Sequence, residues 1–275
     1  MNFFIKIFYS DNDKNKPLYV KIINLIFVFL IIGLVLALSY NKIMAPNLSG
    51  GQTAFDKFSV NMGRIYKYRE TVKKGFMLTI LISLWSLFFS LLFGFLGAVF
   101  QRSKIQVLHY IGKMYVELVR GTPLLVQIIA VYYFVGTLFE LNDKFAAGVL
   151  ILSIFEGAYI SEIIRAGVES ISNTQIETAR SLSLTKVQTY IYIIFPQVIR
   201  RILPPLAGQF VSLVKDSSLL SIIALAEFTQ VVQNITSLNF NYTEGYILLG
   251  AGYLILTFPI SILSKYLERK FKYET

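Results

Sequence analysis

The chain of 275 residues has no cysteine and a single histidine, His109, and only 15% of its residues are charged. Without cysteine there is no disulfide framework, no thiolate metal site and no cysteine nucleophile. One histidine leaves too few ligands and bases for the common metal and acid–base sites. Soluble domains carry about 25% charged residues. The composition therefore argues against a soluble enzyme, and we expect no catalytic residues and no metal site.

Apolar residues are abundant instead, at 55% of the chain, with a mean hydropathy of +0.60 and a net charge of +10. A chain this apolar is not disordered, because it has too much surface to bury. A positive charge can serve nucleic-acid binding, but that requires a basic face on a soluble domain. In a membrane protein the same charge marks loops that stay on the cytoplasmic side. We therefore expect a bilayer environment and no nucleic-acid partner.

Long apolar stretches identify the membrane spans. A bilayer core of about 30 Å requires about 20 predominantly apolar residues in a helix. We predict six spans, at residues 22–41, 75–101, 121–139, 145–168, 202–226 and 245–264. The first could instead be a signal peptide, but its apolar run is longer than the usual 7–15 residues. That length favours a retained anchor.

Basic residues set the orientation of the spans. With both termini in the cytoplasm, 16 basic residues fall in cytoplasmic segments and eight in outside segments. Seven of those eight lie in the outside loop at 41–74, although basic residues are normally concentrated on the cytoplasmic side. Apolar residues recur there at helical spacing from Phe55 to Tyr66, which predicts an amphipathic helix in the membrane interface. This pattern accounts for charge in the loop, but not for its positive sign.

The loop between the fourth and fifth spans is long and polar, yet it has the signals of structure. Thr174 and Glu177 have the spacing of a capping box, and a short helix can follow. Thr185 and Gln188 have the same spacing and would begin the next helix. The sequence thus predicts two short helices with a bend between them on the cytoplasmic side.

This loop resembles the EAA loop in the permease subunits of bacterial ATP-binding-cassette (ABC) importers. The pattern is EAA, three residues, Gly, nine residues and I-x-L-P, and here it reads Glu177-Thr178-Ala179, Ser183 and 193–196. Further segments resemble the polar amino-acid uptake subfamily of these permeases: VELVRGTPLLVQ (116–127), GAYISEIIRAG (157–167), PQVIRRILPPL (196–206) and KDSSLLSIIALAE (215–227). The resemblance covers about residues 71–270.

The resemblance implies an all-α polytopic membrane protein with a five-helix ABC importer permease core at 71–275 and a coupling loop at about 170–190. Residues 1–70 then form an N-terminal tail, one extra transmembrane helix and the interfacial segment. Such permeases work as a pair of identical or different subunits in the bacterial inner membrane, with two ATPase subunits and an extracytoplasmic binding protein. The chain has no G-x-x-x-x-G-K-[ST] sequence. We therefore expect ATP hydrolysis on the partner and no cofactor here.

The resemblance assigns contact with the ATPase to Glu177, Thr178, Ala179 and Ser183. Glu177 could also cap its own helix, and Ala179 could reflect helix propensity alone. Ser183 stands where the pattern has glycine, which would suit a left-handed bend. Serine can instead cap a helix, so the bend could be built differently here.

A carboxylate within the fourth span is the most informative residue. Glu156 lies about 17 Å into a helix that begins near Phe145, hence near the middle of the membrane. An ionisable group at that depth indicates a functional site. We predict that Glu156 faces the substrate path and binds a cationic group, as of arginine, lysine or histidine. The alternative is an internal ion pair with a buried base such as Lys215.

Other charged residues at the ends of spans have gating or structural roles. Glu162 and Arg165 are three apart, so they can pair on one helix face. Arg120 precedes a Gly-Thr-Pro hinge and could either gate the path or extend to lipid headgroups. Lys215 and Asp216 interrupt an apolar run and predict a helix end.

The sequence thus predicts a permease subunit of an ATP-driven, binding-protein-dependent importer of polar amino acids, and Glu156 favours basic ones. The same sequence features would also fit an ABC permease for another small solute. A stand-alone secondary transporter or channel would show inverted repeats, and none is visible in the sequence.

Overall fold

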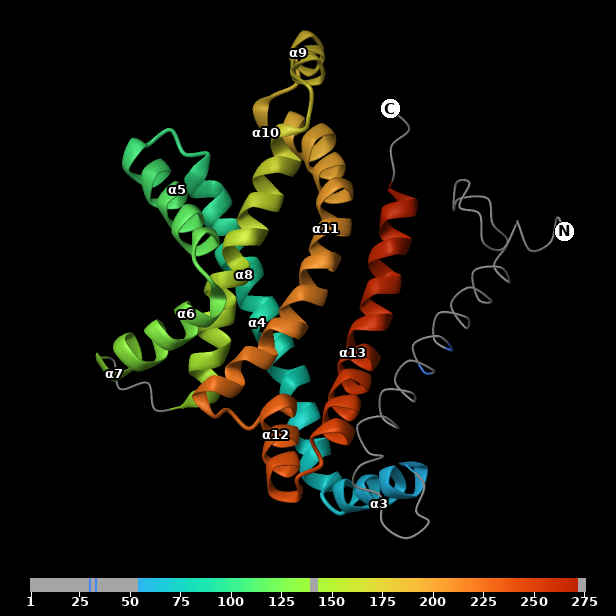
Figure 1. Ribbon diagram of the computed structural model, residues 1–275. Coiled ribbons are helices and arrows are strands. Elements are labelled where there is room, and N and C mark those ends of the chain that lie inside the picture. The colour runs from blue at the N-terminus through green and yellow to red at the C-terminus, as the bar shows by residue number, and fades with distance from the viewer. Residues whose placement is uncertain (1–29, 31–32, 34–53, 139–142, 272–275) are drawn as a thin grey trace, which may run out of the picture. The chain divides into compact units, whose positions relative to one another are not determined.

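The computed structural model describes Leu30, Gly33 and residues 54–138 and 143–271, and every regular element in these ranges is a helix (Figure 1). The chain divides into two units, Met1–Arg64 and Ile65–Thr275. The predicted first span at 22–41 lies outside the described residues, apart from Leu30 and Gly33, which are helical. The helix predicted from the apolar spacing between Phe55 and Tyr66 is confirmed, since α3 spans Ala54–Tyr66.

The second unit is a bundle of long helices with a short helical loop at one end (Figure 1). Its elements are α4 (Arg69–Gln101), α5 (Gln106–Gly121), α6 (Leu124–Ile129), η3 (Ala130–Val135), α7 (Gly136–Leu138), α8 (Lys144–Glu169), α9 (Asn173–Ser181), α10 (Lys186–Gln188), η4 (Thr189–Ile194), α11 (Phe195–Asp216), η5 (Ser217–Ile223), α12 (Phe228–Asn239) and α13 (Tyr242–Lys270). Elements η3 and η4 are π-helical and η5 is a 3-10 helix. Among the described residues, four helices are long and apolar enough to cross a membrane, or five if one bent pair is a single span. The predicted spans 75–101, 145–168 and 245–264 lie within α4, α8 and α13.

The third predicted span needs correction. The segment before it forms α5, and α5 meets the helical segment Leu124–Val135 at an angle of 109°. The break is at Thr122-Pro123, where proline cannot continue the helix. The amide of Gln127 donates to the carbonyl oxygens of Val119 (2.7 Å) and Thr122 (3.1 Å), which the break leaves without helical partners. The bent pair of helices thus has a side-chain donor for the carbonyl groups that its break exposes.

The fifth predicted span also begins earlier than expected. Its helical run extends from Lys186 to Ile223, so Pro204 and Pro205 lie inside α11 and do not start it. The start is fixed further upstream by the Thr185–Gln188 capping box. The predicted helix end at Lys215-Asp216 is confirmed, since α11 ends at Asp216 and the 3-10 helix follows.

The centre of the bundle is the pair α4 and α8, which pack closely because small residues face each other. A Cβ atom on Gly94 would lie 2.4 Å from Cγ2 of Ile160, and one on Gly157 would lie 2.8 Å from Cβ of Phe93. Small residues let membrane helices approach closely where no hydrophobic effect drives association. The pair thereby forms a rigid frame that holds the middle of α8, including Glu156.

Candidate functional site

The transmembrane site is built around Glu156, which α8 holds fully buried. The side-chain amide of Gln209, on α11, donates to Oε2 of Glu156 at 2.5 Å. The other oxygen, Oε1, is also buried but has no hydrogen-bond partner among the residues that the structure describes. A buried carboxylate oxygen without a partner carries a large desolvation cost. One buried acceptor of the site, Oε1 of Glu156, therefore lacks a donor among the described residues.

A second carboxyl group lies beside it. The carboxyl group of Asp216, at the end of α11, is close enough to that of Glu156 for the two to interact electrostatically. Lys215, which was considered as an ion-pair partner of Glu156, is exposed. No ion pair joins these two described residues. Gln209 was not predicted, although its spacing of seven residues from Asp216 places both on one face of a helix. Two acidic side chains and one amide thus meet between α8 and α11.

A cluster of charges lies where α8 meets the end of α5. Glu162 pairs with Arg165 through both its oxygens, which confirms the predicted pair on one helix face. Arg165 also binds Glu169. Arg120, at the end of α5, lies 3.9 Å from Glu162. Its guanidinium group also lies 5.3 Å from the centre of the Tyr159 ring. Arg120 therefore ties the end of α5 to α8.

The coupling loop has the two predicted helices, α9 and α10, but the first begins differently from the prediction. Helix α9 starts after Ser172, so Thr174 lies inside the helix and does not cap it. The capping role considered for Glu177 is therefore wrong. The second capping box is confirmed: the Thr185 hydroxyl accepts from the Gln188 N–H, and the Gln188 side chain accepts from the Thr185 N–H.

The bend between the two helices is built as a glycine would build it. Ser183 has φ of 59°, in the left-handed region. The N–H of Leu184 donates to the carbonyl of Ala179, and the N–H of Ser183 donates to that of Arg180. This is the hydrogen-bond pattern of a Schellman motif, in which glycine usually occupies the left-handed position. The alternative of a capping serine is thus excluded, and the bend keeps its geometry despite the substitution.

The left-handed backbone of Ser183 is strained, and this strain leads to a prediction about stability. Replacing Ser183 with glycine removes a left-handed conformation that costs a non-glycine residue about 1 kcal/mol. We expect the melting temperature of the purified chain in detergent to rise by about 2–4 °C. The matched control is Ser181→Gly, which puts glycine in the last turn of α9 and should lower it. A fall in both variants would contradict the strain at Ser183.

The remaining loop residues divide by exposure. Ala179 is fully buried within this chain, so its small size serves the packing of the loop itself. Glu177 and Thr178 are exposed, and the Thr178 hydroxyl donates to the carbonyl of Thr174 at 2.8 Å. Leu182 and Val187 are 68% and 66% exposed. The loop thus presents polar and apolar side chains together on its surface.

A buried carboxylate at the opposite end of the bundle was not predicted. Glu227 caps α12 by accepting from the N–H groups of Thr229 (2.8 Å) and Gln230 (2.9 Å). It also accepts from the hydroxyls of Tyr253 (3.1 Å) on α13 and Thr79 (3.3 Å) on α4. Burial raises the pKa of the Glu227 carboxyl above its ordinary value, against the opposing effect of these donors. Glu227 joins three helices through one side chain.

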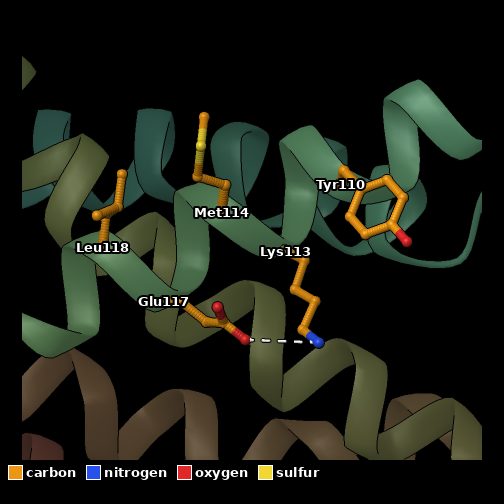
Figure 2. Close-up of a pocket in the computed structure, with 5 residues that line it drawn as sticks. All are labelled: Tyr110, Lys113, Met114, Glu117 and Leu118. Carbon is orange, nitrogen blue, oxygen red and sulfur yellow. Dashed lines mark ion pairs between the residues drawn. The ribbon is translucent and has the colours of Figure 1, made fainter.

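The exposed side of α5 carries a shallow open groove that is not part of this site. Tyr110, Met114 and Leu118 line it, together with an ion pair between Lys113 and Glu117 at 3.7 Å (Figure 2). Both charges are more than half exposed, so the pair contributes little stability. No group of three potential metal ligands occurs among the residues that the structure describes.

Residues 90–273 match the family described as "Binding-protein-dependent transport system inner membrane component". The chain belongs to this family. It is therefore a multi-pass permease component of the inner membrane, and it is not the ATPase of the system. Membership implies a separate ATPase and a binding protein as partners.

Individual relatives agree with this assignment. The permease is 36% identical over 216 residues to the "Probable glutamine ABC transporter permease protein GlnM" of Bacillus subtilis, covering 78% of this chain and 95% of the relative. It is 34% identical over 201 residues to the "Glutamine transport system permease protein GlnP" of Escherichia coli K12, covering 72% and 92%. A crystal structure of "an amino acid ABC transporter with histidines" matches with 35% identity and a TM-score of 0.70, covering 75% of this permease and 96% of that chain. The resemblance to polar amino-acid permeases of ABC importers is thereby confirmed.

Proposed function

We propose that this permease imports amino acids with a cationic side chain, and that Glu156 recognises the cation. The supporting observation is the buried Oε1 atom of Glu156, which has no hydrogen-bond partner in the described part of the chain and has Asp216 beside it. Two acidic groups attract a guanidinium, ammonium or imidazolium group more strongly than a neutral amide. Relatives named for glutamine and a structure containing histidines support the amino-acid class.

The energy for transport reaches the site through the coupling loop. Leu182 and Val187 are apolar side chains on an exposed polar loop, which is typical of a surface that a partner covers. Glu177, Thr178 and Ser183 supply exposed groups on the same loop. The side-chain amides of Gln175 on α9 and Gln197 on α11 are joined at 2.7 Å. Movement of the docked loop is thereby passed to α11, which carries Gln209 and Asp216.

Arg120, Glu162 and Arg165 then act as an inner gate, because their ion pairs join α5 to α8 across the break in the third crossing. Opening the gate would separate Arg120 from Glu162. Two permease subunits enclose one path, and both termini face the cytoplasm. The basic segments near the coupling loop support this orientation. Residues 1–70 are an added anchor, in keeping with a family match that begins at residue 90.

Cargo selectivity tests the proposal. In proteoliposomes with the ATPase and binding protein, Glu156→Gln should reduce arginine uptake at least tenfold while glutamine uptake changes less than twofold. The reason is that the amide keeps the size and the Gln209 contact but loses the charge. The matched control is Glu117→Gln, at an exposed carboxylate on α5, which should change neither. Equal loss of both cargoes in Glu156→Gln would refute a role in selectivity.

A further inference from the structure

The four basic residues between 67 and 74 remain without a function in the transport scheme. Lys67, Arg69, Lys73 and Lys74 surround a single acid, Glu70, and all five are exposed. They are more than half of the seven basic residues that orientation alone does not explain. Arg69 lies over the Tyr66 ring and 3.9 Å from Glu70. Neither Lys73 nor Lys74 makes an ion pair within the described part of the chain.

These lysines lie at the end of the bundle opposite the coupling loop. The coupling loop follows the end of α8, whereas Lys144, at the start of α8, donates to the carbonyl of Ala224 at 3.2 Å. Glu227 follows a few residues later and is joined to Thr79 of α4. Figure 1 shows the start of α4 next to α12 and far from α9. The lysines therefore precede the apolar part of α4 at the membrane surface remote from the ATPase.

A groove on α4 continues from the lysines into the apolar region. It is lined by Glu70, Lys73, Lys74, Met77, Leu78 and Leu81. Met77 and Leu81 are 49% and 46% exposed. This face is opposite the stripe that α4 buries, which includes Gly75 and Thr79. The groove thus has cationic groups at its entrance and an apolar floor along the helix.

We propose that this groove binds an anionic phospholipid of the leaflet opposite the coupling loop. The ammonium groups of Lys73 and Lys74 would hold the lipid phosphate, and Met77 and Leu81 would contact an acyl chain. Glu70 can accept a hydrogen bond from a headgroup hydroxyl, which favours a glycerol headgroup such as that of phosphatidylglycerol. Tyr66 and Tyr68 are exposed beside the lysines, and aromatic side chains of this kind sit at headgroup level.

The chain carries its own reporter for this site. Trp85 is the single tryptophan of the sequence. It lies on α4 one turn beyond Leu81 and is 49% exposed. Lipids with bromine in the middle of their acyl chains quench tryptophan fluorescence at short range. Quenching of Trp85 in the full-length chain therefore reports which lipid occupies this face of α4.

The experiment compares brominated phosphatidylglycerol with brominated phosphatidylcholine in mixed vesicles that contain the purified full chain. We expect phosphatidylglycerol to be preferred about tenfold at Trp85. The double variant K73Q/K74Q should reduce the preference to about onefold, whereas the control K104Q, at an exposed lysine between α4 and α5, should keep it. Equal quenching by both lipids in the native chain, or an unchanged preference in K73Q/K74Q, would overturn the proposal.

Competition separates a lipid site from a simple anion site. Unlabelled long-chain phosphatidylglycerol should relieve the quenching, while inorganic phosphate and short-chain phosphatidylglycerol at the same concentration should not. Relief by inorganic phosphate would show that only the charge of the ligand matters and would overturn the role of the apolar floor. These comparisons use the native chain, so they hold even if the lysine variants fail to fold.

Discussion

Replacing Ala179 with leucine is expected to reduce ATP-driven uptake at least tenfold. Ala179 is fully buried on α9, and its carbonyl accepts the Leu184 N–H that closes the bend after the helix. Three extra carbon atoms have no space there, and overpacking of this kind costs about 1–3 kcal/mol. The loop can escape that cost only by moving α9 away from η4, against which it packs. Uptake in proteoliposomes should fall at least tenfold, and copurification of the ATPase should weaken in parallel.

The controls separate lost coupling from lost folding. Ala179→Ser adds one atom and can donate to a backbone carbonyl one turn earlier, so it should keep most of the uptake. The melting temperature of Ala179→Leu should fall by only a few degrees, because the change is confined to the loop. Normal ATPase copurification with Ala179→Leu would show that α9 does not need this packing in order to dock.

Removing the Glu227 side chain should give the largest loss of stability. In Glu227→Ala two backbone N–H groups at the start of α12 and the hydroxyls of Tyr253 and Thr79 lose their acceptor. Loss of a cap costs about 1 kcal/mol, and buried unsatisfied groups add about 1–3 kcal/mol. The melting temperature in detergent should fall by about 10 °C, and Glu117→Ala, at an exposed carboxylate, should leave it unchanged.

The conservative change Glu227→Gln tests the charge separately from the hydrogen bonds. Because the folded pKa is raised, Glu227 contributes its full stability below the ordinary glutamate pKa and loses it as pH rises through the raised value. Glutamine does not ionise, so its melting temperature should vary less with pH in that range. A pH dependence identical to that of the native chain would assign the effect to another group.

Membrane helices were predictable where composition alone decides them. Helices α4, α8 and α13 have long apolar runs, and each contains its predicted span. Hydropathy located apolar runs at 121–139 and 202–226 but not where the helices begin, because helical structure starts further upstream in both cases. Local features set those boundaries: Pro123 separates α5 from α6, and the Thr185–Gln188 capping box begins the helical run that leads into α11.

The sequence predicted the charged residue of the candidate site, Glu156, but not its neutral partner, Gln209. Glu156 was recognisable because a carboxylate at that depth is costly. Gln209 has no such cost, and only the packing of α8 against α11 gives it a role. Glu227 belongs to no predicted span, so its burial depends on contacts with Thr79 and Tyr253, which are remote in sequence. Ser183 shows the reverse case, in which an unfavourable residue retains the conformation of a glycine.

The break held by Gln127 has a consequence for how the permease meets the bilayer. Helix α5 has 16 residues and the segment Leu124–Leu138 has 15. They are about 24 Å and 22 Å long, so each is shorter than a hydrocarbon core of about 30 Å. A continuous helix adapts to a thicker or thinner membrane by tilting as one rod. In a bilayer, this bent pair would meet hydrophobic mismatch through the angle between its two short helices, next to Arg120.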